Sequence, residues 1–143
     1  MTALTNDYIW EIMVVQGFTA GDDIVIGAGA PTTITNGPVV KGQLHRVIAN
    51  GTAGGAIQMR SILSNDNPQF VVIVNDSANS VNVFPFKATA AGATDTAENI
   101  NGAQSAFAIA SNAAAAFFCS LAQIKRKGQS TPNALNWSAA TFT

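Results

Sequence analysis

Few residues in this chain could perform acid–base or nucleophilic chemistry. The single histidine, His45, stands between Leu44 and Arg46 in a run that alternates apolar and polar residues. An arginine beside a histidine lowers the histidine pKa and disfavours a role as general base. No serine of the chain lies in the G-x-S-x-G motif of a nucleophile elbow. We therefore interpret His45 as a surface or hydrogen-bonded structural residue, and we predict no catalytic site and no enzymatic activity.

Metal, cofactor and phosphate sites are supported no better. One cysteine, Cys119, and one histidine cannot form a Cys/His zinc site, and a single cysteine forms no disulfide within the chain. Asp22 and Asp23 could supply oxygen ligands to calcium, but the spacing of an EF-hand loop does not follow them. The glycine-rich stretches at 27–29 and 51–55 match neither the dinucleotide-binding motif nor the P-loop motif. We predict no bound metal, no cofactor and no small-molecule substrate.

The composition disfavours nucleic acid and membrane partners. The 143 residues are 48% hydrophobic and 10% charged, and seven Lys and Arg against eight Asp and Glu give a net charge of −1. A chain with this balance has no general attraction to nucleic acid or to an anionic membrane, and no apolar run reaches the length of a transmembrane helix. A small domain with so few charges tends to associate. The composition therefore favours a structural or assembly role.

One basic run stands out. Lys125, Arg126 and Lys127 hold three of the seven positive charges. Nucleic-acid-binding proteins usually add further basic residues and aromatic stacking platforms, whereas most aromatic residues here lie in runs typical of a core. We interpret the run as a solvated loop tip or as a contact with an acidic protein surface.

The elements that must position these residues are short strands. Runs of roughly four to eight residues rich in β-branched and aromatic side chains are typical of strands. Asn-Gly pairs and a reversal rich in Asn and Ser at 75–80 separate them. Regularly spaced turns predict an all-β fold, an antiparallel β-sandwich or jelly-roll-like single domain over residues 1–143, with residues 1–7 as a candidate N-terminal arm. The predicted strands are 8–15, 23–26, 44–48, 57–63, 70–74, 81–86 and 115–121, with 70–74 as a central strand.

The alanine-rich segment 103–118 is open to two interpretations. Alanine is the best helix former, so a helix of this length could form. Phe107 and Ile109 are two residues apart, however, and the turn pair Ser111 and Asn112 falls in the middle. We favour two strands joined by a turn and keep the helix as the alternative.

A second pattern runs through about half of the chain, residues 70–137. An apolar strand ends in asparagine, the next strand ends in a hydrophobic residue and proline, and an Ile-Asn-Gly turn, two alanine-rich strands and a late tryptophan follow. These features are residues 71–85, 98–103, 107–110, 115–119 and Trp137. Their order resembles a β-rich module of tailed-bacteriophage virion proteins, found in head decoration (cement) proteins and in tail or head fibre proteins. The polar, basic insertion at 125–132 departs from that pattern.

The resemblance implies a structural virion protein. A stand-alone domain of 143 residues fits a capsid decoration protein better than a fibre, and such proteins form homotrimers that clamp neighbouring major capsid protein subunits on the capsid exterior. The resemblance thus implies a protein that is made in the host cytoplasm and is then bound to the assembled head. The alternative is a tail- or head-fibre module that binds a carbohydrate or a host receptor through an exposed aromatic residue, with Trp10 and Trp137 as the only tryptophans.

The expected capsid or subunit contacts follow from this interpretation. Aromatic residues near the N-terminus are expected in a core or subunit contact, and the loops at 20–23, 53–56 and 125–127 are expected to meet the shell. The candidate contact residues are Tyr8, Trp10, Asp22, Asp23, Lys125, Arg126 and Lys127.

Overall fold

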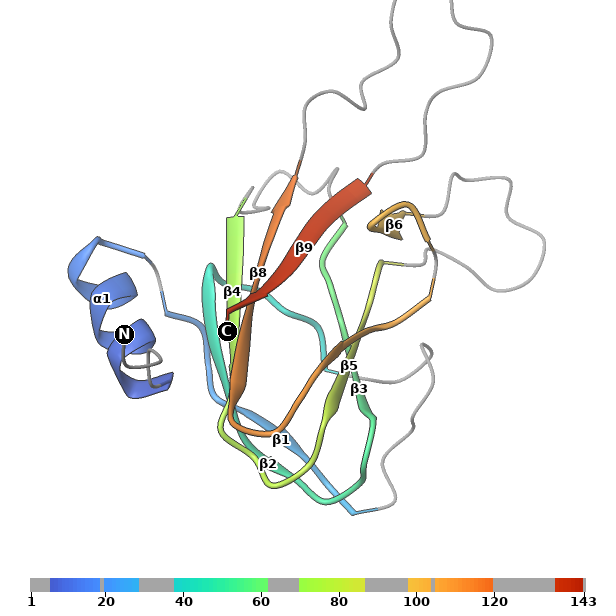
Figure 1. Cartoon of the computed structure of the whole chain (residues 1–143), viewed down its shortest axis with the longest axis horizontal. Coiled ribbons are helices and arrows are strands. Elements are labelled where there is room, and N and C mark those ends of the chain that lie inside the picture. Colours follow the sequence, from blue (N-terminus) through green and yellow to red (C-terminus); the bar gives the residue numbers. More distant parts are fainter. Residues whose placement is uncertain are drawn as a thin grey trace, which may run out of the picture.

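The computed structural model describes one helix and nine strands (Figure 1). The described residues are 6–18, 20–28, 38–61, 70–86, 98–103, 105–119 and 136–142. The elements are α1 Asn6–Val15, β1 Ile24–Ile26, β2 Leu44–Asn50, β3 Gly55–Gln58, β4 Phe70–Asn75, β5 Val81–Phe84, β6 Asn99–Ile100, β7 Phe107–Ile109, β8 Ala113–Cys119 and β9 Asn136–Phe142. The described chain is thus mostly β, as an all-β fold requires.

The strands form two mixed sheets. A six-stranded sheet has the order β1-β2-β4-β8-β9-β6, and a three-stranded sheet has the order β3-β5-β7. From β2 to β5 the chain changes sheet at every step and reverses direction each time, so that β2 and β4 are parallel in one sheet and β3 and β5 are parallel in the other.

The expectation of an antiparallel arrangement is wrong for four strand pairs. β1 with β2 and β6 with β9 are also parallel, whereas β4 with β8, β5 with β7 and β8 with β9 are antiparallel. Turn residues show that a chain reverses direction, but they do not show whether the next strand joins the same sheet or the facing one.

The main core lies between the two sheets. The six-stranded sheet contributes Val71, Ile73, Phe117 and Trp137, and the three-stranded sheet contributes side chains such as Ile57. All of these are at most 1% exposed. Burial of an aliphatic or aromatic side chain of this size stabilises a fold by roughly 1.5–3 kcal/mol each. This core fixes how the two sheets face one another.

Residues 8–15, predicted as a strand, form part of helix α1 instead. Ile9 and Met13, one helical turn apart, pack with Trp10 against the outer face of the six-stranded sheet, where they cover Leu44 and Val72. Figure 1 shows α1 on the side of this sheet opposite β3 and β5. Because nearly every position from 8 to 15 is apolar, the run satisfies both a strand period and a helix period. The contact with the sheet favours the helix over the intrinsic strand preference.

Polar contacts hold the N-terminal end of α1. The Asn6 side chain donates to the Asp76 carboxylate at 2.7 Å and to the Asn75 carbonyl at 3.3 Å. Arg46 on β2 forms an ion pair with the same Asp76 carboxylate at 2.7 Å. Its guanidinium also stacks over the Trp10 ring, 4.9 Å from the centroid. These contacts tie the helix to the corner that follows β4.

Most other strand predictions are confirmed. Residues 103–118 contain β7 and β8 with a turn between them, so the helix alternative is wrong; Asn112 adopts a φ of 56°, which asparagine tolerates in turns. β4 lies in the interior of its sheet, as predicted for 70–74. Of the run 57–63, only residues 57–58 lie in a strand, because β3 ends at Gln58; residues 62–63 lie outside the described residues. The other matches are 23–26 with β1, 44–48 with β2, the first four residues of 81–86 with β5 and residues 115–119 of 115–121 with β8. Residues 120–121 lie outside the described residues.

The corners at one end of the two sheets share a network of asparagine and serine side chains. The Asn75 amide, fully buried, donates to the carbonyls of Ile109 and Ala110 at 3.2 and 2.9 Å and accepts from the Ser77 backbone and hydroxyl. Asn79 donates to the Asn50 carbonyl at 2.8 Å. The reversal at 75–80 was predicted from its Asn and Ser content. Its side-chain hydrogen bonds link the corner after β4 to the corners after β2 and after β7.

This network makes a direct prediction for Asn75. Replacement by alanine removes one amide that serves both sheets. The carbonyls of Ile109 and Ala110 and the backbone N–H of Ser77 lose their bonds to Asn75, while the Ser77 hydroxyl keeps its bond to the Asn79 carbonyl. Because each unsatisfied buried group costs about 1–3 kcal/mol, Asn75→Ala is expected to lower the free energy of unfolding by at least about 2 kcal/mol. Urea denaturation measures this loss.

A matched substitution identifies the cause. Asn82 lies in β5 and is half-buried, so Asn82→Ala removes the same atoms from outside the corner network. We expect it to cost less than about 1 kcal/mol. Equal losses in the two variants would contradict a special role for the Asn75 amide.

Candidate functional site

The described residues contain no cluster of groups suited to metal or nucleophilic chemistry. No three His, Cys, Asp or Glu side chains among them gather closely enough to hold a metal ion. Cys119 is half-buried, and burial, with the negative charge of Glu98 nearby, raises the pKa of its thiol. A raised pKa keeps the thiol protonated at neutral pH and unreactive. The chemistry available in the described part of the chain is that of surfaces and hydrogen bonds.

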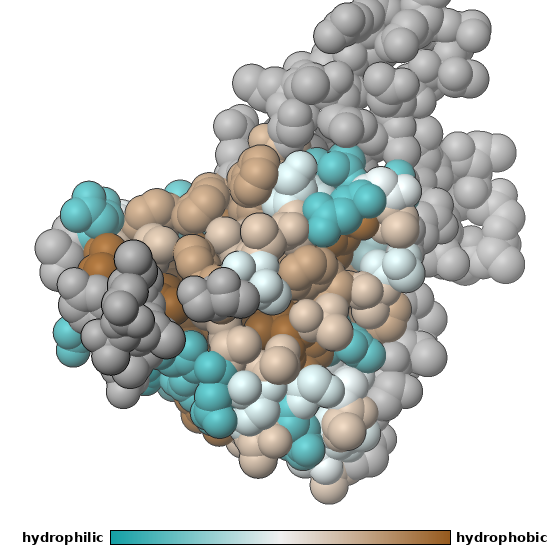
Figure 2. All heavy atoms as spheres, viewed as in Figure 1, coloured by the Kyte–Doolittle hydropathy of each residue, from teal (hydrophilic) through white to brown (hydrophobic). Residues whose placement is uncertain are grey.

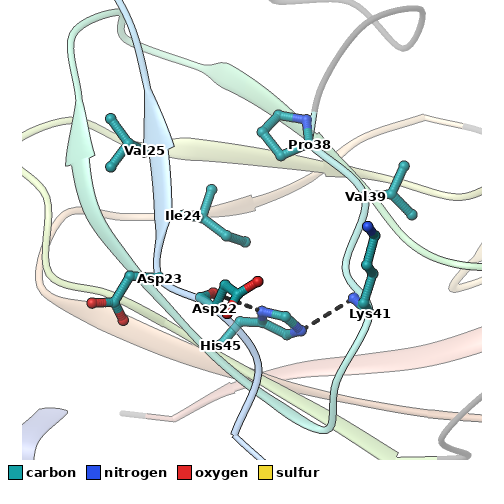
Figure 3. Close-up of a pocket in the computed structure, with 8 residues that line it drawn as sticks. All are labelled: Asp22, Asp23, Ile24, Val25, Pro38, Val39, Lys41 and His45. Atoms are coloured by element: carbon teal, nitrogen blue, oxygen red, sulfur yellow. Dashed lines mark hydrogen bonds between the residues drawn. The ribbon is translucent and has the colours of Figure 1, made fainter.

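A groove opens between the edges of the two sheets. One wall is β1, the edge strand of the six-stranded sheet, and the other is residues 38–41 (Figure 3). This second wall follows β3, because Val40 donates to the Gln58 carbonyl at 2.8 Å and Gln58 donates to the Pro38 carbonyl at 2.9 Å. The groove has a volume of about 360 Å³. Its lining residues are Asp22, Asp23, Ile24, Val25, Pro38, Val39, Lys41 and His45.

His45 forms the floor of the groove and is 3% exposed. Its Nε2 atom accepts hydrogen bonds from the backbone N–H groups of Gly42 at 2.7 Å and Lys41 at 3.2 Å. Its Nδ1 atom lies 3.2 Å from the Asp22 carbonyl. A neutral ring whose Nε2 accepts a hydrogen bond carries its proton on Nδ1. The hydrogen-bond partners of His45 therefore indicate a neutral imidazole whose Nδ1–H donates to the Asp22 carbonyl.

Burial lowers the pKa of His45 below its usual value. Hydrogen bonding to the Asp22 carbonyl and the Asp22 charge act in the opposite direction without cancelling that effect. The sequence prediction of a hydrogen-bonded structural histidine agrees with this geometry, while the surface alternative is wrong. The predicted cause is wrong as well, because Arg46 is engaged with Asp76 and Trp10, and burial dominates the shift.

The structure separates the residues that the sequence analysis grouped as candidate contacts. Asp22 and Asp23 are exposed at the groove, and Figure 3 shows the Asp23 carboxylate on the far side of β1 from Pro38 and Val39. Trp10 is half-buried on the outer face of the sheet, and Tyr8 lies in α1. The basic residues Lys125, Arg126 and Lys127 lie outside the described residues.

A charge-free face, missed by the sequence analysis, covers part of the six-stranded sheet. α1 packs over the β2 and β4 part of its outer face, and the apolar cluster beneath it reaches Ala114, Ala116 and Phe142 at the near side of β8 and β9. Beyond this cluster, Phe118 and Ala140 are exposed. No residue of these two strands carries a charge. Phe118 is 47% exposed there. Figure 2 shows apolar residues over much of the visible surface of this region, with hydrophilic residues around them.

The register of β8 and β9 defines this face. Phe118 pairs with Ser138, Ala116 with Ala140 and Ala114 with Phe142, and all six alternate with side chains directed to the core, such as Phe117 and Trp137. This face could have been predicted from the run Ala113–Cys119, because the residues that point to either side of this strand are all apolar. A strand that is apolar on both faces is normally covered on both faces. The outward-facing residues form the β8–β9 face: Ala114, Ala116, Phe118, Ser138, Ala140 and Phe142. Ala114 is buried and, with Ala116 and Phe142, packs against the cluster under α1, so the open part of the face is centred on Phe118, Ser138 and Ala140.

Comparison of the chain with protein-family models, with curated proteins and with solved structures finds no match. The resemblance to phage modules therefore depends on the sequence pattern of residues 70–137 alone. Within the described residues, no helix is long and apolar enough to span a membrane.

The fit of the His45 ring beneath the groove can be tested at Gly21. A Cβ atom at this position would overlap the ring, which three backbone groups hold in place. We expect Gly21→Ala to lower the free energy of unfolding by about 1–3 kcal/mol, because the ring or the backbone must move. Thermal or urea denaturation measures the change.

Gly27 provides the matched control. A Cβ atom at this position meets nothing within 4 Å, and Gly27→Ala is expected to change stability by less than about 1 kcal/mol. A Gly21→Ala protein as stable as Gly27→Ala would show that the ring is not confined as described.

Proposed function

We propose that the chain is a structural virion protein of a tailed bacteriophage, a capsid decoration protein that binds the assembled head from outside as a homotrimer. The observation that carries this proposal is the β8–β9 face. A half-exposed sheet normally presents polar residues to water, whereas this face presents Phe118 and small side chains without a charge. An apolar surface of this kind is typical of a protein–protein contact.

The small side chains suit a close symmetric contact. Ala140 and Ser138 have small side chains, so that a second protein surface can approach the backbone beside them, and Phe118 supplies a large, half-exposed apolar side chain for such a contact. In a homotrimer the contact is heterologous, so this face of one copy packs against a different surface of the next copy and the ring closes after three. We assign the β8–β9 face to the contact between subunits.

The same proposal includes the finer architecture. We propose a single β-sandwich domain of the jelly-roll kind, in which two curved sheets of mixed strand direction enclose one core. Support comes from the inward side chains of both sheets, such as Val71 and Ile57, which share one apolar cluster.

Shell stabilisation follows from mass action. A protein that binds only the closed shell lowers the free energy of that state relative to open or dissociated forms, and three linked binding sites strengthen the attachment. Asp22 and Asp23 at the groove, with the basic residues 125–127, stay candidate contacts with the major capsid protein. No catalytic step is part of this proposal.

The alternative of a fibre module that binds carbohydrate receives less support. Such a site needs an exposed aromatic platform, and Trp137 is fully buried in the core. Trp10 is half-buried, with the Arg46 guanidinium over its ring. Neither tryptophan presents a free ring face comparable to the exposed side chain of Phe118.

Assembly in solution tests the assigned face. Light scattering coupled to size-exclusion chromatography should give about three times the chain mass of 14.7 kDa. Phe118→Glu should weaken self-association at least about tenfold, because it replaces a large apolar contact with a charge that loses its hydration. Val25→Glu, a change at another exposed apolar strand residue, 59% exposed on edge strand β1, should leave the mass unchanged.

Shell binding tests the decoration role separately. The wild-type trimer should sediment with purified undecorated phage heads and raise the temperature at which they open. A wild-type protein that stays monomeric at micromolar concentration, or a trimer that binds glycans and ignores heads, would contradict the proposal.

A further inference from the structure

The corner before β2 is joined to both sheets through one side chain. Residues 38–40 run beside β3 of the three-stranded sheet, and the chain then turns at 41–43 into β2 of the six-stranded sheet. His45, on β2, accepts the N–H groups of Lys41 and Gly42 from this turn. The other ring nitrogen contacts the Asp22 carbonyl just before β1. One imidazole therefore connects the two walls of the groove.

This connection requires a neutral ring. The Gly42 N–H points at the Nε2 lone pair from 2.7 Å, and protonation would place a second N–H in the same line. Two donors cannot share a hydrogen bond, so the imidazolium must release Gly42 and Lys41 or leave its buried position. The contact with the Asp22 carbonyl survives protonation, because Nδ1 is a donor in both states. The bonds that break are those to the turn 41–43.

We propose that His45 is an acid-sensitive latch that fastens the wall formed by residues 38–41 to the segment before β1, and that its protonation releases this wall. The charged groups around the ring are Asp22 and Asp23 beside β1 and Lys41 on the opposite wall. Arg46, the next residue of β2, is engaged with Asp76 on the outer face. The negative charge of Asp22 favours the imidazolium, so the neutral ring depends mainly on burial. The two backbone donors decide which hydrogen bonds protonation breaks.

The direction of the pH effect follows from linkage. Burial lowers the pKa of His45 in the closed state below its ordinary value of 6.5. A group with a lower pKa in the closed state stabilises that state fully above pH 6.5, and the stabilisation is lost as the pH falls toward the lower value. Acid therefore opens the latch, and neutral pH closes it. Protonation of a single histidine is sufficient.

Amide hydrogen exchange on the full chain tests the latch. Between pH 6.5 and the pKa of the closed state, the protection factor of the Gly42 amide should fall about tenfold per pH unit. The amide of Phe117, in the core of the six-stranded sheet, should keep its protection over the same range. In ¹⁵N spectra at neutral pH, the His45 ring should carry its proton on Nδ1.

Two outcomes would overturn the proposal. One is a Gly42 protection factor that stays constant to pH 5, or that falls only together with that of Phe117, since the first shows no opening and the second shows global unfolding. The other is a His45 ring protonated on Nε2 at neutral pH. His45→Gln supplies the control, because glutamine keeps an acceptor but does not titrate, and its Gly42 protection factor should be independent of pH. This test does not depend on the state of assembly, so its failure would leave the proposed decoration role untouched.

Discussion

Buried side-chain amides at the corners are the constraint on which the two-sheet arrangement depends. Where the chain crosses from one sheet to the other, its backbone N–H and C=O groups have no neighbouring strand to bond with. These groups need other hydrogen-bond partners at each corner. Asn75 satisfies carbonyls at the end of β7, and Asn79 and Asn50 join the corners after β4 and β2. Serine hydroxyls complete the set, as where Ser111 donates to the Ser77 carbonyl at 2.7 Å. With these groups paired inside the protein, the strands can alternate between sheets without burying unsatisfied backbone groups.

Local signals predicted most strands because the relevant physics is local. Alternation, β-branched residues and Asx turns identified β2, β4, β5 and the β7–β8 pair, and the reversal at 75–80 was expected from residues able to bond their own backbone. Two features escaped prediction because they depend on distant contacts. Helix α1 owes its form to the sheet surface under Ile9 and Met13. The mixed strand direction depends on which sheet each strand joins, and no residue near a turn encodes that choice.

The candidate functional surfaces were likewise predictable only as far as local sequence signals reach. The scarcity of reactive residues predicted a structural role for His45, but its position beneath a groove depends on Gly21 and Gly42, which the strand pattern does not connect to it. The β8–β9 face was present in the sequence as an alanine-rich strand with no polar side. Its significance required the register with β9, which brings Phe118 and Ala140 onto one surface. Among the sequence candidates, Asp22 and Asp23 lie at the groove, and Trp10 lies elsewhere on the outer face.

The alternation of strands between sheets also has a kinetic consequence. Leu44 pairs with Val72, and Phe70 pairs with Phe118, so neighbouring strands are far apart along the chain. Folds dominated by such distant pairings must close large loops before their contacts form, and they typically fold over milliseconds to seconds. Asn75 can reach the β7 carbonyls only after both layers have come together. During this interval the newly made chain exposes apolar strand edges. The yield of folded protein therefore depends on whether each chain folds before it meets another partly folded chain and aggregates.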